Sequence, residues 1–434
     1  MRKKWYVFLL SSGLLCSQTS IAKEHSYDEI LAEYSFLQSL SVDTGDFEVI
    51  EPWRFMLEVN NSANTDRDSS AFQSILSAAK FSLLTATDSV DLSYETDGGD
   101  AYHGFNGIYD TGSSSHQSWH VEFVGDYSLS RVEIEDSGGL EDDVAWNLGA
   151  YGLYDADFSE PEGVYQWSIG ARWQVLNNAV DTAIGDIEES QFLLPGFAFR
   201  WRTVSSWGES QGRLGFEWND AGLANTETIE ASALLCTSFY MEIAPACGVQ
   251  IDSIIGTDDG VDFQLATAEY QYSLGFGAEA FDATRSRIVW IVSAQSSLGF
   301  PLQSYFQRSI GGLHSVRGYK EQALSGDNVI ESSIEYQQRF FVGKVDLWGR
   351  IFVDWAQVET ESFTIRARAV DLSVTREREI EGQRRFMRSW GGGFDIRVDQ
   401  QLTLYVMWGT VLTGIDEDNE EGDSRLHGYL RYLF

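Results

Sequence analysis

The sequence contains few of the residues that define several common protein classes. Its 434 residues include only three cysteines, five prolines and five methionines. Three cysteines are too few for a disulfide-rich scaffold or a cysteine-rich metal site. Beyond the N-terminus the chain also lacks any run of about 18 apolar residues, which a membrane-spanning helix needs. A helical membrane transporter is therefore excluded.

Basic residues are scarce as well. Thirty lysines and arginines stand against 66 aspartates and glutamates, which gives a formal charge of -36. Such a field repels phosphate groups, so nucleic-acid binding is excluded as a general function. Aromatic residues, by contrast, make up 14% of the chain, and this excludes disorder because disordered acidic chains are poor in them. Two classes remain: a large exported β protein or an outer-membrane β-barrel.

Residues 1–22 have the pattern of a secretory signal peptide. A basic start at 2–4 precedes an apolar stretch at 5–15, and a small-x-small cleavage pattern ends at Ala22. The apolar stretch is too short for a membrane anchor. The chain is therefore predicted to be exported, and Cys16 is removed with the leader.

Two cysteines, Cys236 and Cys247, remain after cleavage. An even pair in an exported chain predicts one disulfide. Both cysteines lie in apolar, strand-like sequence, so the predicted bond staples a hairpin, which belongs either to the sheet or to a loop.

Residues 23–48 are interpreted as an N-terminal amphipathic helix and a linker. Within Tyr27–Leu40, apolar side chains recur at helical spacing. Ser26 followed by Glu29 forms a capping box. Three positions stay open for this helix: a plug inside a barrel, a lid at its periplasmic mouth, or a surface-lying helix.

From about residue 49 to the C-terminus the apolar period changes to two. In 345–357, for example, Ile351 and Val353 alternate with Arg350 and Asp354. Segments of about 10 residues repeat this pattern many times, with long acidic loops between some of them, as in transmembrane barrels. Lipid offers backbone groups no hydrogen-bond partner, so a spanning sheet must close on itself. The fold class predicted for 49–434 is therefore all-β, a transmembrane antiparallel barrel.

The alternation predicts 16 barrel strands, or 18 if the hairpin around Cys236 and Cys247 joins the wall. Their boundaries are reliable only to a few residues. The candidate strands are roughly 52–61, 71–84, 87–97, 104–112, 118–134, 144–154, 164–176, 191–204, 211–220, 262–276, 286–299, 328–341, 344–358, 384–398, 401–411 and 424–434.

The last candidate strand has the form of an insertion signal. Its alternate apolar residues end in Tyr432 and Phe434 on one face. A terminal aromatic residue after such alternation resembles the C-terminal signal by which bacterial outer-membrane barrels are recognised. The resemblance implies the outer membrane of a Gram-negative cell, contact with the barrel-assembly machinery during biogenesis, and a final environment of lipid and lipopolysaccharide.

A specific motif lies between two of the candidate strands. Residues 306–319 read FQRSIGGLHSVRGY, a Gly-Asp-Asn turn follows at 326–328, and the next strand contains SIEY at 333–336. The strand after that holds FVDWA at 352–356, with alanine where the family pattern has glycine. These segments resemble the two-partner secretion transporters of the haemolysin secretion/activation family, within the BamA-like superfamily of barrels. The likeness covers roughly residues 50–434 and is strongest over 306–356.

The resemblance implies that the Val-Arg-Gly-Tyr segment forms the tip of a long loop folded into the lumen, where Arg317 pairs with Asp354 on the wall. Alternation agrees, because it places Asp354 on the inward face. A carboxylate in a low-dielectric lumen needs a partner, and the planar fork of arginine can bind it bidentately. Glycines 311, 312 and 318 permit a tight backbone path. The predicted loop-lock and gating residues are Val316, Arg317, Gly318, Tyr319, Phe352 and Asp354, with Gly311 and Gly312 as loop glycines.

The resemblance also implies a function, namely translocation of an exported exoprotein through the barrel. Family members carry periplasmic POTRA domains before the barrel, and the stretch between residue 22 and the first predicted strand is too short for one. We therefore expect a barrel that lacks POTRA domains. Two alternatives stay open: a channel or structural barrel that kept the lock but no longer translocates protein, and a barrel-assembly factor.

No catalytic constellation is found. The Gly-x-Ser-x-Gly match at 208–212 needs a strand-to-helix turn in an α/β sheet, whereas here it is interpreted as a turn between β-strands. The six histidines have no metal-ligand spacing, and the acidic run 416–423 lacks the spacing of a calcium-binding loop. We therefore expect no enzyme activity, cofactor or metal.

Overall fold

The structure is a computed structural model. It describes residues 53–61, 72–85, 87–97, 102–112, 118–134, 139–159, 162–180, 186–205, 208–219, 224–227, 251–256, 263–276, 286–302, 304–342, 345–369, 375–399 and 401–434. The predicted signal peptide, the predicted helix at 27–40 and the cysteine pair at 236 and 247 lie outside the described residues.

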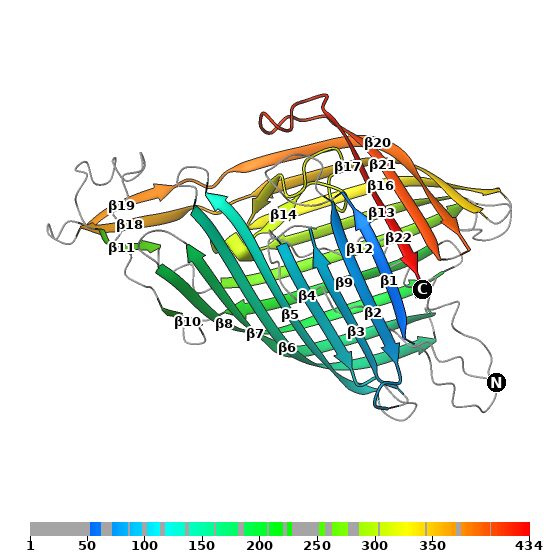
Figure 1. Ribbon diagram of the computed structural model, residues 1–434, viewed down its shortest axis with the longest axis horizontal. Coiled ribbons are helices and arrows are strands. Elements are labelled where there is room, and N and C mark those ends of the chain that lie inside the picture. The colour runs from blue at the N-terminus through cyan, green and yellow to red at the C-terminus, as the bar shows by residue number, and fades with distance from the viewer. Residues whose placement is uncertain are drawn as a thin grey trace.

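Sixteen strands form one closed antiparallel barrel (Figure 1). Each strand pairs with its neighbour in the chain order of the barrel, and the last pairs with the first. The barrel strands are β1 (Arg54–Asn60), β2 (Gln73–Phe81), β3 (Ser89–Thr96), β4 (Tyr102–Asp110), β5 (Trp119–Ile134), β6 (Gly139–Ser159), β7 (Glu162–Val180), β8 (Asp186–Val204), β9 (Gly208–Asn219), β12 (Phe263–Phe276), β13 (Ser286–Ser296), β16 (Asn328–Val342), β17 (Val345–Glu359), β20 (Arg384–Val398), β21 (Leu402–Val411) and β22 (Ser424–Leu433).

The first and last strands close the cylinder. In the seam between β1 and β22, Met56 lies opposite Leu433 and Asn60 lies opposite Tyr429. A reciprocal pair of backbone hydrogen bonds between residues 55 and 434 extends this seam. Because the sheet closes on itself, no barrel strand presents an unpaired backbone edge to lipid.

The pleat sorts side chains between lipid and lumen. On β17, Ile351 and Val353 are 62% and 57% exposed on the outer surface, whereas Arg350 and Asp354 are buried inside. The same alternation holds on β7 and β22, where large apolar side chains point outward and polar ones inward. The outer face is therefore an apolar belt that suits hydrocarbon, and the inner face is polar.

Six short strands lie outside the barrel ladder proper. The segment β10 (Ala224–Glu227) pairs with β8 beyond the end of β9. A separate three-stranded sheet, made of β11 (Ile251–Gly256), β18 (Phe363–Ala369) and β19 (Thr375–Ile380), projects beyond one end of the barrel, at the left in Figure 1. Two strands of three residues, β14 (Arg308–Ile310) and β15 (Leu324–Gly326), pair within the loop between β13 and β16.

The fold confirms the predicted barrel and its 16 strands, and the 18-stranded alternative is wrong. Strands β6, β7 and β8 extend beyond the predicted segments, because their ends are polar and carry no lipid-facing alternation. The prediction of a turn at 208–212 is also wrong, since these residues begin β9. Among the described residues, no helix has the length and apolar character of one that crosses a membrane.

Candidate functional site

The loop at residues 297–327 leaves the wall between β13 and β16 and folds into the barrel (Figure 1). It contains the 3-10 helix η2 (Ser304–Phe306) and the paired strands β14 and β15. Ile310, Val316 and Tyr319 are fully buried and pack with wall residues that include Ala356. The luminal loop, as we call residues 297–327, therefore shares an apolar core with the barrel wall.

The base of the luminal loop is held by the Gly-Asp-Asn turn. The Asp327 carboxylate accepts hydrogen bonds from the backbone N–H groups of Leu302, at 2.9 Å, and Glu361, at 2.6 Å. The side-chain oxygen of Asn328 accepts one from the backbone N–H of Ser297 at 3.0 Å. These bonds satisfy backbone donors at the point where the strand ladder ends. They also tie the two ends of the loop to each other.

Glycine is required at the turns of the luminal loop. Gly311, Gly312 and Gly318 have φ angles of 119°, 98° and 97°, a region that residues with a Cβ rarely adopt. At the tip, a Cβ on Gly318 would lie 2.9 Å from the carbonyl carbon of Gly409 on β21. The tip therefore packs backbone against backbone on the wall, which only a pair of glycines permits.

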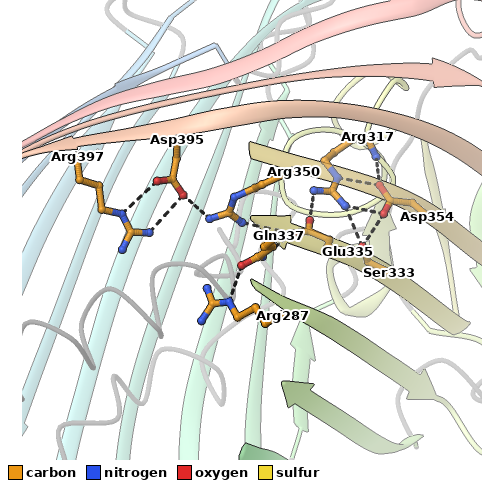
Figure 2. A network of polar contacts seen from close by, with 9 residues as sticks. All are labelled: Arg287, Arg317, Ser333, Glu335, Gln337, Arg350, Asp354, Asp395 and Arg397. Atoms are coloured by element: carbon orange, nitrogen blue, oxygen red, sulfur yellow. Dashed lines mark hydrogen bonds and ion pairs between the residues drawn. The ribbon is translucent and has the colours of Figure 1, made fainter. Parts of the chain in front are cut away.

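Arg317 donates three hydrogen bonds to the Asp354 carboxylate of β17 (Figure 2). The backbone N–H and Nε of Arg317 donate to Oδ2 of Asp354 at 3.0 and 2.9 Å, and Nη2 donates to Oδ1 at 2.7 Å. Arg317 is 4% exposed and Asp354 is 1% exposed. This is the bidentate fork that suits an arginine and a carboxylate, and here a backbone donor strengthens it.

Three further wall residues complete the surroundings of Arg317. Its Nη1 donates to the Glu335 carboxylate on β16, and its Nη2 donates to the Ser333 hydroxyl at 2.8 Å. The guanidinium also lies 3.6 Å from the ring centroid of Phe352, a cation–π contact. The side chain is thus held on every polar atom, so its position at the wall is specified rather than adaptable.

The ionisation of Arg317 is secure. Burial by itself would lower the pKa of Arg317, but the attraction of Asp354 and Glu335 outweighs burial and raises the pKa well above the usual value. The guanidinium therefore stays charged at every pH at which the protein is folded. Two carboxylates face one arginine at this point, so a second cation is needed on the wall.

Arg350 supplies that cation and extends the network across three strands (Figure 2). Its Nη1 lies 3.3 Å from the second oxygen of Glu335, and its Nη2 donates to Asp395 on β20 at 2.5 Å. Asp395 in turn contacts Arg397 at 3.3 Å. Positive and negative charges thus alternate from the loop tip across β16, β17 and β20, so the buried charges balance locally.

A second ion pair holds the loop closer to its base. Arg308 of β14 donates to one oxygen of Glu331 on β16 at 2.5 Å, and the Ser315 hydroxyl donates to the other at 2.5 Å. Glu331 and Glu335 lie on the same inward face of β16. The loop is therefore anchored at two successive carboxylates of one strand.

The opposite side of the loop tip contacts β20, β21 and β22. The backbone N–H of Gly318 donates to Nε2 of His427 at 3.0 Å, so that nitrogen carries no proton. The Tyr319 hydroxyl lies 2.6 Å from the carbonyl oxygen of Thr413 and accepts a hydrogen bond from the backbone N–H of Arg388 at 3.0 Å. The tip is thus clamped between the wall that carries Asp354 and the wall formed by the last strands.

The connection between β21 and β22 covers the residue that follows the tip. The Asn419 side-chain oxygen accepts a hydrogen bond from the backbone N–H of Lys320 at 2.8 Å. The Lys320 ammonium group contacts Asp418 at 2.7 Å, where both side chains are exposed. Part of the acidic run at 416–423 therefore holds the loop instead of standing free in solvent.

Little empty space remains beside the lock. A cavity of ≈ 60 Å³ is lined by Leu313, Arg317, Glu335 and Tyr405, among others. That volume holds a few water molecules and is far smaller than a typical ligand pocket of about 300 Å³ or more. Within the described residues, no group of three or more His, Cys, Asp or Glu side chains is placed to hold a metal ion.

The structure brings Val316, Arg317, Gly318, Tyr319, Phe352 and Asp354 together at one point of the lumen. Tyr432 and Phe434 lie on the outer face of the last strand, where their rings stack on each other. Sequence reasoning missed five contributors to the network, which are Ser333, Glu335, Arg350, Asp395 and Arg397. The signal available for them was their polar character on inward-facing positions of three neighbouring strands.

A closed 16-stranded antiparallel cylinder, with an apolar outer belt and a loop held in its lumen, resembles the outer-membrane Omp85 barrels in its fold. Residues 248–400 match the Omp85 superfamily domain. This segment contains the luminal loop, Arg317 and Asp354. Over this segment the chain is thus similar to the Omp85 superfamily domain.

Solved structures of outer-membrane barrels share the fold of this chain. The chain is similar to CdiB from Escherichia coli, with 12% identity and a TM-score of 0.63 over 88% of this chain and 63% of that one. CdiB from Acinetobacter baumannii gives 14% identity and a TM-score of 0.61, with 88% and 60% coverage. BamA from Haemophilus ducreyi lacking POTRA domains 1–3 gives 12% identity and a TM-score of 0.53, over 88% of this chain and 70% of that one. The chain therefore spans less than two thirds of the length of either CdiB. No curated protein sequence matches the chain.

Proposed function

We propose that the protein is a protein-translocation pore of the two-partner secretion type in the outer membrane of a Gram-negative cell. The observation that carries the proposal is the fork of Arg317 on Asp354, which holds a loop inside the lumen that a substrate would have to occupy. The fold shared with CdiB, a two-partner secretion transporter, supports it. The substrate is an exported exoprotein, and a signal peptide at 1–22 directs the chain itself to export.

The proposal extends to the other partners of the barrel. Lipid and lipopolysaccharide surround the apolar belt, and the barrel-assembly machinery recognises the strand that ends in Tyr432 and Phe434. The interior has no catalytic task, since the work done there is the movement of a loop. The protein is accordingly not an enzyme and uses no cofactor.

The wall can stabilise the state in which the loop has left the lock. Separating one partner from a buried ion pair costs about 3–5 kcal/mol when the other charge stays unpaired. Here Asp354 keeps the Ser333 hydroxyl, at 2.7 Å, and Glu335 keeps Arg350 and the Gln337 amide. The carboxylates that Arg317 leaves behind are therefore not isolated. This lowers the cost of opening and lets the loop return to a preformed site.

Secretion by cells that produce the full chain tests the proposal. The readout is the amount of the exoprotein encoded beside the gene that reaches the medium, normalised to the level of folded barrel. Arg317→Gln should lower secretion about tenfold or more, because a loop that no longer returns to its preformed site does not reset the pore between substrates, and a 1.4 kcal/mol change in loop free energy gives a factor of ten. The matched control is Arg339→Gln, which breaks an ion pair with Asp346 between the same two strands but away from the loop. It should leave secretion unchanged.

Planar-bilayer conductance separates translocation from passive conduction. On the proposal, Arg317→Gln raises small-ion conductance and lowers secretion together, because the same loop controls both. If conductance rises while secretion of the exoprotein stays at the wild-type level, the barrel is a channel that retained the lock, and the proposal fails.

A further inference from the structure

Two arginines face each other on the wall far from the luminal loop in sequence. Arg200 of β8 lies directly opposite Arg213 of β9 in the strand register. Both are on the inward face, where they are 5% and 7% exposed. Two buried positive charges side by side repel each other, so the arrangement is unfavourable unless an anion compensates it.

Most of the donors of this pair are unused. The Nε and Nη2 atoms of Arg213 and the Nη2 atom of Arg200 are buried and have no hydrogen-bond partner among the described residues. Among the described residues, the pair has one side-chain hydrogen bond, from Nη1 of Arg200 to the Gln166 amide oxygen at 3.2 Å. Each unsatisfied buried donor costs free energy, and the cost is larger for a charged group.

The neighbouring arginine shows that this wall can satisfy such a side chain. Arg172 on β7 forms a complete fork with Glu217 on β9, at 3.0 and 2.9 Å, and donates its remaining Nη1 to Gln174 at 2.8 Å. Glu217 is four residues along the same strand from Arg213. The strand therefore supplies a carboxylate to Arg172 but none to the pair formed by Arg200 and Arg213.

Two carboxylates act on the pair from a distance. Glu269 lies opposite Arg213 in the register of β12, and Glu122 is on β5. Both attract Arg200 electrostatically, but neither arginine of the pair forms an ion pair within the described part of the chain. These carboxylates thus offset only part of the repulsion between the two arginines, and they leave the three buried donors without a hydrogen-bond partner.

We infer that Arg200 and Arg213 form a binding site for one oxyanion, a carboxylate or phosphate group, on the luminal wall. The planar forks of two arginines match such a group, whose oxygens would accept the three free donors. The oxyanion is either a free ion or a carboxylate on a polypeptide in the lumen. The site does not depend on the proposed translocation activity, because a barrel with any function can bind an anion there.

Binding is measured on the full chain in detergent micelles at constant ionic strength, with chloride as the balancing anion. Inorganic phosphate is the first probe, and its ³¹P resonance should broaden in the presence of the protein. The double variant Arg200→Gln with Arg213→Gln should weaken binding about tenfold or more, because charge-assisted hydrogen bonds are lost. Each single variant is measured as well, so that one misfolded protein does not decide the result.

Arg287→Gln is the matched control. Arg287 is also a luminal arginine, but its Nε is already bonded to Gln337 at 2.6 Å and its guanidinium stacks on Trp348. Its replacement should leave phosphate binding unchanged. Circular dichroism and heat-modifiable gel migration confirm that each variant has formed the barrel before binding is compared.

Two further probes identify the source of the oxyanion. If free ions occupy the site, acetate should displace bound phosphate. If the site takes carboxylates on a chain, tetraglutamate should bind and neither phosphate nor acetate should. Either result supports the inference. It is overturned if no probe binds the wild type, or if binding is equal in the double variant. It is also overturned if binding appears only in Glu269→Gln, since Glu269 would then be the anion that occupies the pair.

Discussion

The two halves of the luminal wall differ in how completely their buried charges are paired. On the C-terminal half, Arg317 and Arg350 alternate with Asp354, Glu335 and Asp395, so almost every charge has a partner of opposite sign. On the N-terminal half, Arg172 pairs with Glu217 and Arg202 with Glu209, whereas Arg200 and Arg213 face each other and form no ion pair with a described carboxylate. Both halves have the same strand geometry and the same polar interior.

The difference shows that burial alone does not decide what a luminal charge does. In the C-terminal half the charges bind one segment of the chain, the luminal loop, and the network fixes its position. In the N-terminal half the unpaired donors of Arg200 and Arg213 bind no such segment among the described residues, which suits reversible binding of a ligand. A closed network acts as a lock, whereas an open one is available to a ligand.

Replacing one arginine in each half should give the largest difference between the two halves. Arg317→Ala leaves Asp354 and Glu335 with only their wall partners, so it should lower the free energy of unfolding by about 3 kcal/mol, the lower end of the cost of breaking a buried ion pair. Arg213→Ala removes a charge that forms no ion pair among the described residues, so it should change the free energy of unfolding by about 1 kcal/mol or less. Denaturant unfolding of both variants in lipid vesicles is the measurement. Equal losses in the two variants would show that the halves do not differ in this way.

A glycine in each half tests the backbone contact at the loop tip. Gly318→Ala introduces a Cβ at positive φ and within 2.9 Å of Gly409, and should cost about 1–3 kcal/mol. Gly152→Ala on β6 places its Cβ 3.8 Å from the nearest neighbour, so it should have little effect. Melting temperatures of the two variants, compared in the same lipid, measure this. A larger loss at 152 than at 318 would contradict the close packing of the tip.

The Tyr319 hydroxyl should contribute less than the glycine. Tyr319→Phe keeps the ring but leaves the carbonyl of Thr413 and the backbone N–H of Arg388 without this partner, for an expected loss of about 1–2 kcal/mol. The control is Tyr94→Phe on β3, whose hydroxyl bonds His103 at 2.8 Å in a half-buried setting. Amide hydrogen exchange at the ends of β20 and β21 should accelerate in the first variant alone. If exchange accelerates in neither variant, the Tyr319 hydroxyl does not hold the loop tip against these strands.

The smallest effect is expected at the exposed end of the loop. The hydrogen bond from Lys320, together with its charge, lowers the pKa of Asp418 below the usual 3.8. The contact therefore contributes stability above pH 3.8, and this contribution is lost as the pH falls through the lower folded-state pKa. Lys320→Ala should reduce the melting temperature slightly at pH 6 and not at pH 2, and 1 M salt should remove the difference. A pH-independent difference would assign the loss to packing.

The fold was predictable because the two-residue period reports which face meets lipid. All 16 barrel strands carry that signal. The period gives no information beyond the apolar belt, so the polar ends of β6, β7 and β8 and the projecting strands β11, β18 and β19 were not predicted. These segments pair through backbone groups, and their sequences are short or polar, as in TREREI of β19, so they do not form the segments of about 10 alternating residues that mark a barrel strand.

The site was predictable only in part. The motif resemblance predicted Arg317 and Asp354, and the parity of residue positions, which is the alternation of inward and outward side chains along a strand, placed Asp354 inside. Parity also places Glu335 and Arg350 inside, but it does not say which inward charges meet, because that depends on strand stagger and on where the loop tip lies. The contact between Gly318 and Gly409 could not be predicted, since 91 residues of sequence and a whole barrel closure separate the two backbones.

The most direct test of the central claim is the accessibility of a residue at the loop tip. Val316→Cys, in a background without the native cysteines, places a thiol at a position that is 1% exposed when the loop is locked. A membrane-impermeant maleimide should label it slowly in lipid vesicles, and adding Asp354→Asn should accelerate labelling about a hundredfold, as expected for loss of about 3 kcal/mol. Equal labelling rates with and without Asp354 would contradict the claim that this pair holds the loop in the lumen.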